Sequence, residues 1–364
     1  MELNGNQNAA AAAHAFSIEG DLRGAEPYGS GHINDSYRAV FQCNGHQSRY
    51  LLQRINHRIF KNPVTLMENI ERVTAHLAAQ VSSYPDRNRR VLTLIPTRSG
   101  GVLHVDDKGD FWRAYLFIDH ATTYNSVSSS DQAFQAAKAF GEFQRMLADM
   151  PAPRLNDTIP DFHHTPKRFA ALEQAIAADA AGRIALAQPE VDFALARKPL
   201  ARALVDAGLP ERVTHNDTKI NNVMLDDATG EGTCVIDLDT VMPGLAAYDF
   251  GDMVRTATSS APEDEQDLSK VKMEFPLFEA LARGYLSTAS EFLTPAEKES
   301  LAVAGKLITF EIGIRFLTDY LSGDTYFKVH RQGHNLDRAR TQFKLLESIE
   351  QQEGQIRTLL RTLN

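Results

Sequence analysis

The sequence predicts an α+β fold with two lobes, a β-rich N-terminal lobe and a mainly helical C-terminal lobe. Short apolar runs bounded by turn residues dominate residues 20–118, which is the pattern of strands. From about residue 130 onward, apolar residues recur at helical spacing. A chain of 364 residues is long enough for two such lobes. We therefore expect one lobe over residues 1–118 and the other over residues 119–364.

The N-terminal lobe is expected to contain a small sheet with one inserted helix. The alanine run at residues 9–13 predicts a short helix capped by Asn8. Asn44 and Gly45 separate two β-rich runs and predict a hairpin turn. Apolar spacing predicts a helix over residues 66–79. The predicted strands are residues 37–43, 49–55, 91–96, 102–105 and 111–118.

The C-terminal lobe is expected to be built from helices around one strand-rich insert. Thr294 and Glu297 form a capping box, with Pro295 at the first helical position, which marks the start of a long helix. Residues 213–239 interrupt the helical pattern with short apolar runs around turns. The predicted helices are residues 131–148, 169–187, 191–207, 295–321 and 337–363.

Composition excludes several classes of function. With 38 Lys and Arg against 47 Asp and Glu, the net charge is −9, so we expect no nucleic-acid partner. No uncharged run of 18 apolar residues is present, so we expect no membrane partner. The first residues lack the basic region of a signal peptide, and the only cysteines are Cys43 and Cys234, which favours the cytoplasm. The oligomeric state stays open, with a monomer slightly favoured.

Polar residues with the spacing of a phosphoryl-transfer site lie in the strand-rich insert. Asp237 follows three apolar residues, and a carboxylate at the end of a buried strand needs a partner such as a divalent metal. Mg²⁺ takes carboxylates, an amide oxygen, waters and phosphates, which suits Asn222 and Asp237. Asp217, in the same loop as Asn222, is placed to accept a proton from a hydroxyl. This spacing predicts a kinase-type site.

A glycine turn in the N-terminal lobe fits the same chemistry. Gly29 and Gly31 flank Ser30 between two expected strands, and glycines let backbone N–H groups approach phosphate oxygens. The same pattern is also typical of an ordinary hairpin. His32 and Asn34, in the same segment, are candidates to reach the sugar or the phosphates.

The pattern H-x-D-x(4)-N followed by I-D resembles the aminoglycoside phosphotransferase and choline kinase family, whose fold is protein-kinase-like. The resemblance covers nearly the whole chain. Within that family, four segments are similar to bacterial N-acetylhexosamine 1-kinases, which phosphorylate the anomeric hydroxyl of N-acetylglucosamine or N-acetylgalactosamine using ATP. These segments are residues 28–37, 214–222, 235–244 and 315–327.

The resemblance implies roles for individual residues. Asp217 would be the catalytic base, and Asn222 and Asp237 would hold Mg²⁺, with ATP as the phosphate donor. His215 would brace the loop. Asp239 would either support the site from behind or contact the sugar.

The resemblance also implies a nucleotide site in the N-terminal lobe. Kinases place a strand lysine on the phosphates, but the equivalent strand here offers Arg54, with Glu71 as the expected partner and Glu68 as the alternative. The other interpretation of Arg54 is a surface ion pair. The backbone of Phe117, Ile118 and Asp119 would form the hinge that binds adenine.

The long helix at residues 295–321 carries Glu311, Arg315 and Asp319 at i, i+4 spacing. This spacing fits either an ion-pair ladder or a polar stripe along a substrate cleft. In the hexosamine kinases the matching Arg and Tyr contact the sugar, which favours Arg315 and Tyr326 as sugar-binding residues, alongside His32, Asp217 and Asp237.

Three further points follow from the sequence. His163 and His164 are read as the approach to a helix, since adjacent histidines point in different directions. An aminoglycoside, choline or homoserine kinase would keep the reaction and change the acceptor, although Arg315 argues against a cationic acceptor. A catalytically silent nucleotide-binding protein is disfavoured because Asp217, Asn222 and Asp237 are all present.

Overall fold

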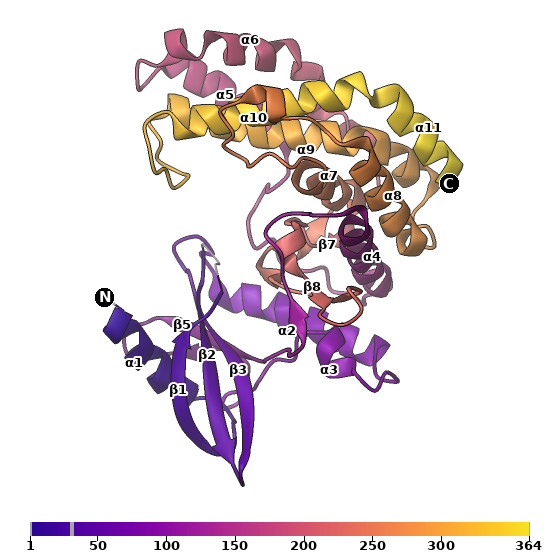
Figure 1. The fold of residues 1–364 in the computed structure, drawn as a ribbon. Helices are drawn as coiled ribbons and strands as arrows, with labels where there is room; N and C mark the ends of the chain where they lie inside the picture. Colours follow the sequence, from indigo (N-terminus) through magenta and orange to yellow (C-terminus); the bar gives the residue numbers. More distant parts are fainter. Residues whose placement is uncertain (1, 30–32, 364) are drawn as a thin grey trace. The chain divides into compact units, whose positions relative to one another are not determined.

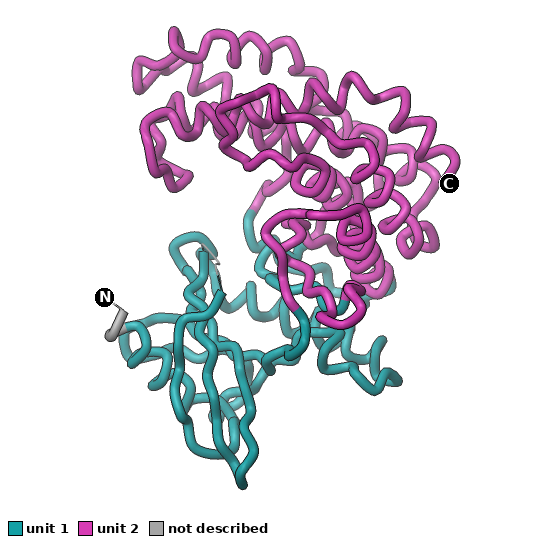
Figure 2. The backbone as a smooth tube through the Cα atoms, in the orientation of Figure 1, with its two compact units in different colours: residues 1–121, 149–159, 233–242 teal, residues 122–148, 160–232, 243–364 magenta. Residues whose placement is uncertain are grey.

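The computed structural model describes residues 2–29 and 33–363 and divides into two compact units (Figure 2). The fold is α+β and protein-kinase-like, with a β-sheet N-terminal region and a helical C-terminal region, which confirms the predicted fold class (Figure 1). Unit 1 comprises residues 1–121, 149–159 and 233–242, and unit 2 comprises residues 122–148, 160–232 and 243–364. The predicted lobe boundary at residues 118 and 119 stays a prediction.

Unit 1 is organised around a five-stranded antiparallel sheet in the order β1-β2-β3-β5-β4. The predicted hairpin is confirmed: Cys43 pairs with His46, and the two residues between them have φ of 49° and 83°, as a tight turn requires. The strands are β1 (Asp21–Pro27), β2 (Asp35–Cys43), β3 (His46–Ile55), β4 (His104–Val105) and β5 (Phe111–Leu116).

Side-chain alternation gives the sheet two different faces. One face packs against α1 (Glu2–Ala13) and carries Phe41, Leu52 and Trp112 in a buried cluster. Arg54 lies opposite Trp112 in the sheet register and therefore belongs to this face. The other face carries Arg113, whose Nε donates to Gln53 at 3.0 Å.

Three predictions for unit 1 need correction or refinement. Helix α1 begins at Glu2, so Asn8 lies inside it and is not its cap. The segment at 91–96 forms no strand of its own, because only an isolated bridge from Leu94 to Tyr115 joins it to the sheet. The helix predicted over 66–79 is α2 (Pro63–Gln80), which Asn62 caps by accepting from the Thr65 N–H at 3.3 Å. A single turn of helix, α3 (Arg87–Arg90), follows.

Unit 2 is a helical body in which α4 packs on α8, and α9 packs on α7 and α10 (Figure 1). Its core holds buried side chains of α9 and α10, including Phe310, Ile314, Leu317 and Phe343. The helices are α4 (Ser130–Leu147), α5 (Thr165–Ala178), α6 (Gln188–Ala196), α7 (Ala246–Ala257), α8 (Phe275–Ala289), α9 (Pro295–Leu321), α10 (His334–Gln351) and α11 (Glu353–Leu363).

The capping box of α9 is confirmed, whereas the last predicted helix is divided. Glu297 N–H donates to the Thr294 hydroxyl at 3.2 Å, and Thr294 N–H donates to the Glu297 carboxylate at 2.8 Å. The predicted helix at 337–363 breaks at Gln352 into α10 and α11. The helices predicted over 169–187 and 191–207 end early and continue as 3₁₀ turns.

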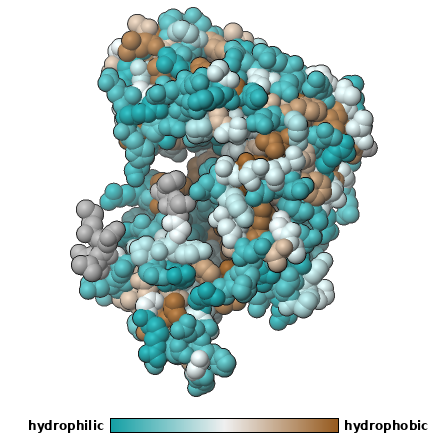
Figure 3. All heavy atoms as spheres, in the orientation of Figure 1, coloured by the Kyte–Doolittle hydropathy of each residue, from teal (hydrophilic) through white to brown (hydrophobic). Residues whose placement is uncertain are grey.

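The remaining strands are short: β6 (Ala121–Thr122), β7 (Arg212–Thr214), β8 (Val223–Asp226), β9 (Gly232–Val235) and β10 (Met242–Gly244). Hydrophilic residues cover most of the face in Figure 3, with hydrophobic residues in scattered groups. Within residues 2–29 and 33–363, no helix is both long enough and apolar enough to cross a membrane.

Candidate active site

The loop after β7 is fixed by one buried carboxylate. The N–H groups of His215 and Asn216 donate to Asp249 on α7, at 2.8 and 2.7 Å. Gln144 also donates to Asp249, at 2.6 Å, and its own carbonyl accepts from the Tyr285 hydroxyl. Burial raises the pKa of Asp249, although His215 and these donors oppose the shift. The sequence alone does not distinguish Asp249 from the other aspartates, because its role depends on contacts with residues that are distant in the sequence.

Asp217 is held as a carboxylate within this loop. Its side chain pairs with Lys219 at 2.8 Å and accepts from Asn222 Nδ2 at 3.1 Å. Burial alone would raise the pKa of Asp217, but the Lys219 ammonium lowers it below the ordinary value. A carboxylate in this state can accept a hydrogen bond from a hydroxyl.

Asn222 and Asp237 carry the donor atoms that Mg²⁺ prefers. Asn222 Nδ2 also donates to the Asp217 carbonyl at 2.8 Å, which leaves Oδ1, the ligand atom of an amide, without a donor among residues 2–29 and 33–363. In unit 1, Asp237 follows β9 and has a left-handed φ of 59°. A non-glycine residue rarely adopts this conformation outside functional sites and turns. An amide oxygen and a carboxylate fit a hard cation that also binds phosphates and waters.

Two histidines brace the loop. The His215 ring lies edge-on to Phe140 and Phe143, at 5.4 and 5.9 Å between centroids, and its Nδ1 accepts from the Asp217 N–H at 3.3 Å. His163 is buried, and its Nε2 lies 3.0 Å from the carbonyl oxygen of Asn216. His163 lies in the approach to α5, as predicted, and its contact with Asn216 gives it a further role that the sequence did not indicate.

His163 forms a buried pair with Glu311 of α9. The Nδ1 to Oε1 distance is 2.8 Å, and the Thr165 hydroxyl donates to the other carboxylate oxygen at 2.6 Å. Burial lowers the pKa of His163, but the Glu311 carboxylate raises it above its ordinary value. Burial raises the pKa of Glu311, and the charge of His163 reverses this and lowers it. His164, in contrast, accepts from the Lys167 N–H as the cap of α5, as predicted.

The polar residues of α9 form no ion-pair ladder. Glu311 is paired with His163, and Asp319 accepts from the backbone N–H groups of residues 325, 326 and 327 at 2.8–2.9 Å. Asp319 therefore shapes the loop that carries Tyr326, whose side chain is 68% exposed. Arg315 lies between the rings of Phe162 and Phe327, each 5.6 Å from its guanidinium carbon.

In unit 1, Asp239 lies at the centre of a second buried network. It pairs with Arg113 of β5 and accepts from Asn34 Nδ2 at 2.6 Å. The side-chain oxygen Oδ1 of Asn34 accepts from the backbone N–H of Asn56 at 3.0 Å. Burial lowers the pKa of Arg113, but the Asp239 carboxylate raises it above its ordinary value. Arg113 was not predicted as a site residue, because its only signal is a charged residue within the buried strand Phe111–Leu116.

Arg54 does not form the predicted pair with Glu71. Its Nε donates to Asp35 at 2.9 Å and its Nη1 donates to Asp110 at 3.0 Å, on the sheet face that α1 covers. Glu71 is exposed on α2, and Glu68 accepts from Asn156 at 3.1 Å. The structure thus contains the ion-pair alternative for Arg54, because its register places it on the face opposite to Arg113.

The remaining predicted nucleotide residues follow two different strands, with Gly29 after β1 and residues 117–119 after β5. Gly29 has a φ of 79°, which requires glycine, while Gly31 and His32 fall outside the described residues. The Phe117 N–H donates to the Arg49 carbonyl at 3.1 Å, and the Asp119 carbonyl accepts from Arg89 at 3.1 Å. Between them, the amide and carbonyl of Ile118 have no partner in the described chain.

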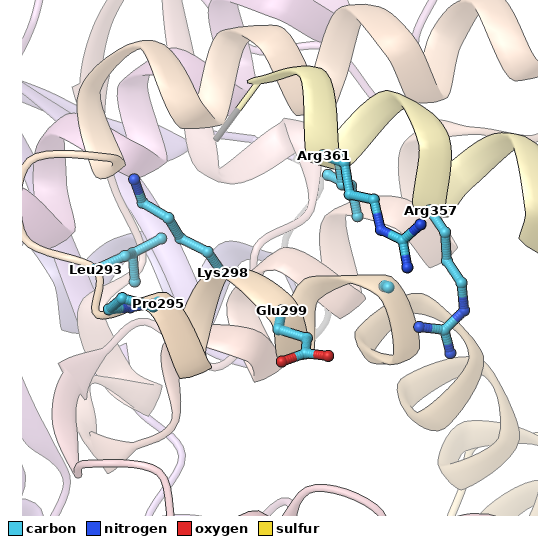
Figure 4. A pocket seen from close by; sticks show the side chains of 8 residues that line it. Leu293, Pro295, Lys298, Glu299, Arg357 and Arg361 are labelled. Carbon is cyan, nitrogen blue, oxygen red and sulfur yellow. The ribbon is translucent and has the colours of Figure 1, made fainter.

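A cavity of about 390 Å³ lies at the start of α9, next to α11 (Figure 4). Its lining combines apolar residues with three basic residues and one glutamate, and none of the predicted site residues lines it. The lining residues are Leu293, Pro295, Lys298, Glu299, Ala302, Arg357, Leu360 and Arg361.

The protein-kinase-like fold and the loop of Asp217 and Asn222 define the class of protein, a small-molecule phosphotransferase. The model of the phosphotransferase enzyme family matches residues 24–285, and the chain belongs to this family.

Solved structures of similar fold support the architecture. A microcompartment-associated aminopropanol kinase superposes with a TM-score of 0.59 at 16% identity, covering 96% of this chain and 98% of the other. A spectinomycin phosphotransferase in complex with ADP and spectinomycin gives 0.57 at 13% identity, with the same coverage. A choline/ethanolamine kinase family protein from Mesorhizobium loti gives 0.55 at 19% identity, covering 98% and 99% of the two chains.

Proposed function

We propose that the protein is an ATP-dependent kinase that transfers the γ-phosphate to the anomeric 1-hydroxyl of N-acetylglucosamine or N-acetylgalactosamine in the cytoplasm. The observation that carries the kinase assignment is the Asp217 carboxylate, kept ionised by Lys219 and bonded to Asn222 within a loop that Asp249 holds. The acceptor assignment is supported by the resemblance of four segments to N-acetylhexosamine 1-kinases.

In this proposal Asp217 is the base that accepts the proton of the sugar hydroxyl. The hydrogen bonds from Asn222 fix the direction of the carboxylate, so that the hydroxyl oxygen is oriented before transfer. Asn222 Oδ1 and the Asp237 carboxylate would hold Mg²⁺, which neutralises phosphate charge when bound. His215 supports the loop, and Asp239 supports the sheet through Arg113 of β5.

The remaining residues would bind the two substrates. Gly29 and Gly31 would cover the phosphates, and the unpartnered backbone groups of Ile118 would bind adenine, with Phe117 and Asp119 on either side. His32, Arg315 and Tyr326 would contact the sugar. Arg54 pairs with Asp35 and Asp110, which argues against nucleotide binding by Arg54 with Glu71 as its partner.

Phosphorus NMR with Mg-ATP and each N-acetylhexosamine tests the proposal. We expect a new phosphomonoester signal coupled to the anomeric proton, growing together with ADP. Intact ATP with both sugars would contradict the acceptor assignment. Parallel samples with choline, ethanolamine, homoserine and kanamycin distinguish the other acceptors, which the aminopropanol and choline/ethanolamine kinases make worth testing.

A further inference from the structure

Two arginines of unit 2 contact the same phenylalanine, Phe162. Arg168 of α5 donates from Nη2 to the Phe162 carbonyl at 3.0 Å, and Arg315 of α9 lies over the Phe162 ring at 5.6 Å. Phe327 faces Arg315 from another side, also at 5.6 Å. Aromatic faces hold a guanidinium in place without using its N–H donors. The donors of Arg315 are therefore available to a ligand.

The acids near this pair already have partners. Glu311 bonds to His163 and Thr165, and Asp161 bonds to Lys167 at 2.7 Å. Within residues 2–29 and 33–363, no carboxylate forms an ion pair with either arginine. Burial and the charge of Arg315 both lower the pKa of Arg168, while Glu311 and Asp161 oppose this shift.

Arg168 also contains an orphaned donor. Its Nε is buried and has no hydrogen-bond partner. A buried donor left unpaired costs free energy, so an oxygen atom from outside the protein would stabilise this position. The residues around Arg168 therefore offer fewer hydrogen-bond acceptors than its guanidinium has N–H donors.

The arginine pair is linked to the catalytic loop within the same unit. The Asn216 carbonyl oxygen contacts His163 Nε2, and His163 Nδ1 contacts the Glu311 carboxylate. Arg315 follows Glu311 by one helical turn on the same face of α9. Asn216 immediately precedes Asp217 in the chain. This series of contacts links the pair to the residue that precedes Asp217.

We propose that Arg168, together with Arg315, binds an unprotonated oxygen of the acceptor, and that in the sugar substrate this oxygen is the carbonyl of the acetamido group. This inference rests on the proposed function. A carbonyl is the strongest hydrogen-bond acceptor of an N-acetylhexosamine, and two guanidiniums that form no ion pair with a carboxylate disfavour a cationic acceptor. Arg168 is thus a residue that separates N-acetylhexosamines from plain hexoses.

Steady-state kinetics of the full chain with Mg-ATP test this assignment. Arg168→Gln should lower the ratio of kcat/KM for N-acetylglucosamine to kcat/KM for glucose by about 10- to 100-fold, the usual effect of a charged hydrogen bond. The loss should be in the sugar KM, with the KM for ATP unchanged. Arg168→Lys should recover part of the ratio. Lys167→Gln, which removes a charge at the adjacent position, should leave the ratio at the wild-type value.

Several outcomes separate this inference from the proposed function. An unchanged ratio in Arg168→Gln, with wild-type turnover of N-acetylglucosamine, overturns the inference alone. Better use of glucuronate than of N-acetylglucosamine, lost in Arg168→Gln, assigns the site to a carboxylate and overturns the acetamido assignment. If neither N-acetylhexosamine is a substrate, the proposed function fails. Calorimetry of N-acetylglucosamine binding to the wild type and to Arg168→Gln then decides the inference, which equal affinity overturns.

Discussion

At the scale of single residues, the most direct chemical role is proposed for Asp217, as the base that accepts the hydroxyl proton. Replacement by asparagine keeps the shape but removes the base. We expect Asp217→Asn to lower kcat by about 10²- to 10⁴-fold, the usual contribution of a general base. Asp227→Asn, at an exposed turn position of the same insert, is the matched control and should keep wild-type turnover. Near-normal turnover of Asp217→Asn would exclude Asp217 as the base.

The His163–Glu311 pair predicts a pH-dependent contribution to stability. The pKa of His163 is raised in the folded protein, so its contribution is complete below the unfolded value of about 6.5 and is lost as the pH rises through the folded value. The pKa of Glu311 is lowered, so its part persists at every pH above about 4.5.

We therefore expect His163→Gln to cost about 1–3 kcal/mol of unfolding free energy at pH 6, and less at pH 9. Urea unfolding at both pH values measures this difference. Thr165→Val removes a neutral donor from the same carboxylate and should give equal losses at the two pH values. A His163→Gln loss that is larger at pH 9 would refute the charged pair.

At the scale of elements, the capping box of α9 offers a test separate from catalysis. Thr294→Ala removes the side chain that accepts from the Glu297 N–H and should cost about 1 kcal/mol of unfolding free energy. Because Thr294 is remote in sequence from Asp217 and bonds only within its own cap, kcat/KM should stay at the wild-type value. Thermal unfolding and kinetics on the same preparation check both statements, and an unchanged melting temperature would count against the cap.

Elements with strong local signals were predictable, and elements defined by distant partners were not. The turn at Asn44 and the cap at Thr294 are determined by residues that are neighbours in the sequence. The break at Gln352 and the missing strand at 91–96 depend on packing and on pairing with other parts of the chain. The site follows the same rule: the spacing of Asp217 and Asn222 is local, whereas the roles of His163 and Arg113 come from partners 53 and 126 residues away.

At the scale of the whole molecule, unit 1 is assembled from three stretches of sequence. Arg113 needs Asp239, and Asn69 on α2 donates to the carbonyls of Asn156 and Val241 at 2.8 and 3.0 Å. A fragment of residues 1–118 would leave these groups unpaired. We expect that fragment to lack cooperative unfolding by circular dichroism, while the full chain unfolds cooperatively. A sharp, reversible transition of the fragment would show that the sheet and α2 suffice.

The pairing of Arg113 with Asp239 also sets an order of events during synthesis. The two residues are 126 positions apart, so at about 5–20 residues per second the arginine waits roughly 6–25 s for its carboxylate to be translated. During that interval the strands of the sheet have been made, but the guanidinium has no buried counterion. The sheet is therefore made before Asp239 but reaches its final state only afterwards, and a nascent chain stalled before residue 239 would expose an unfinished sheet to chaperones and proteases.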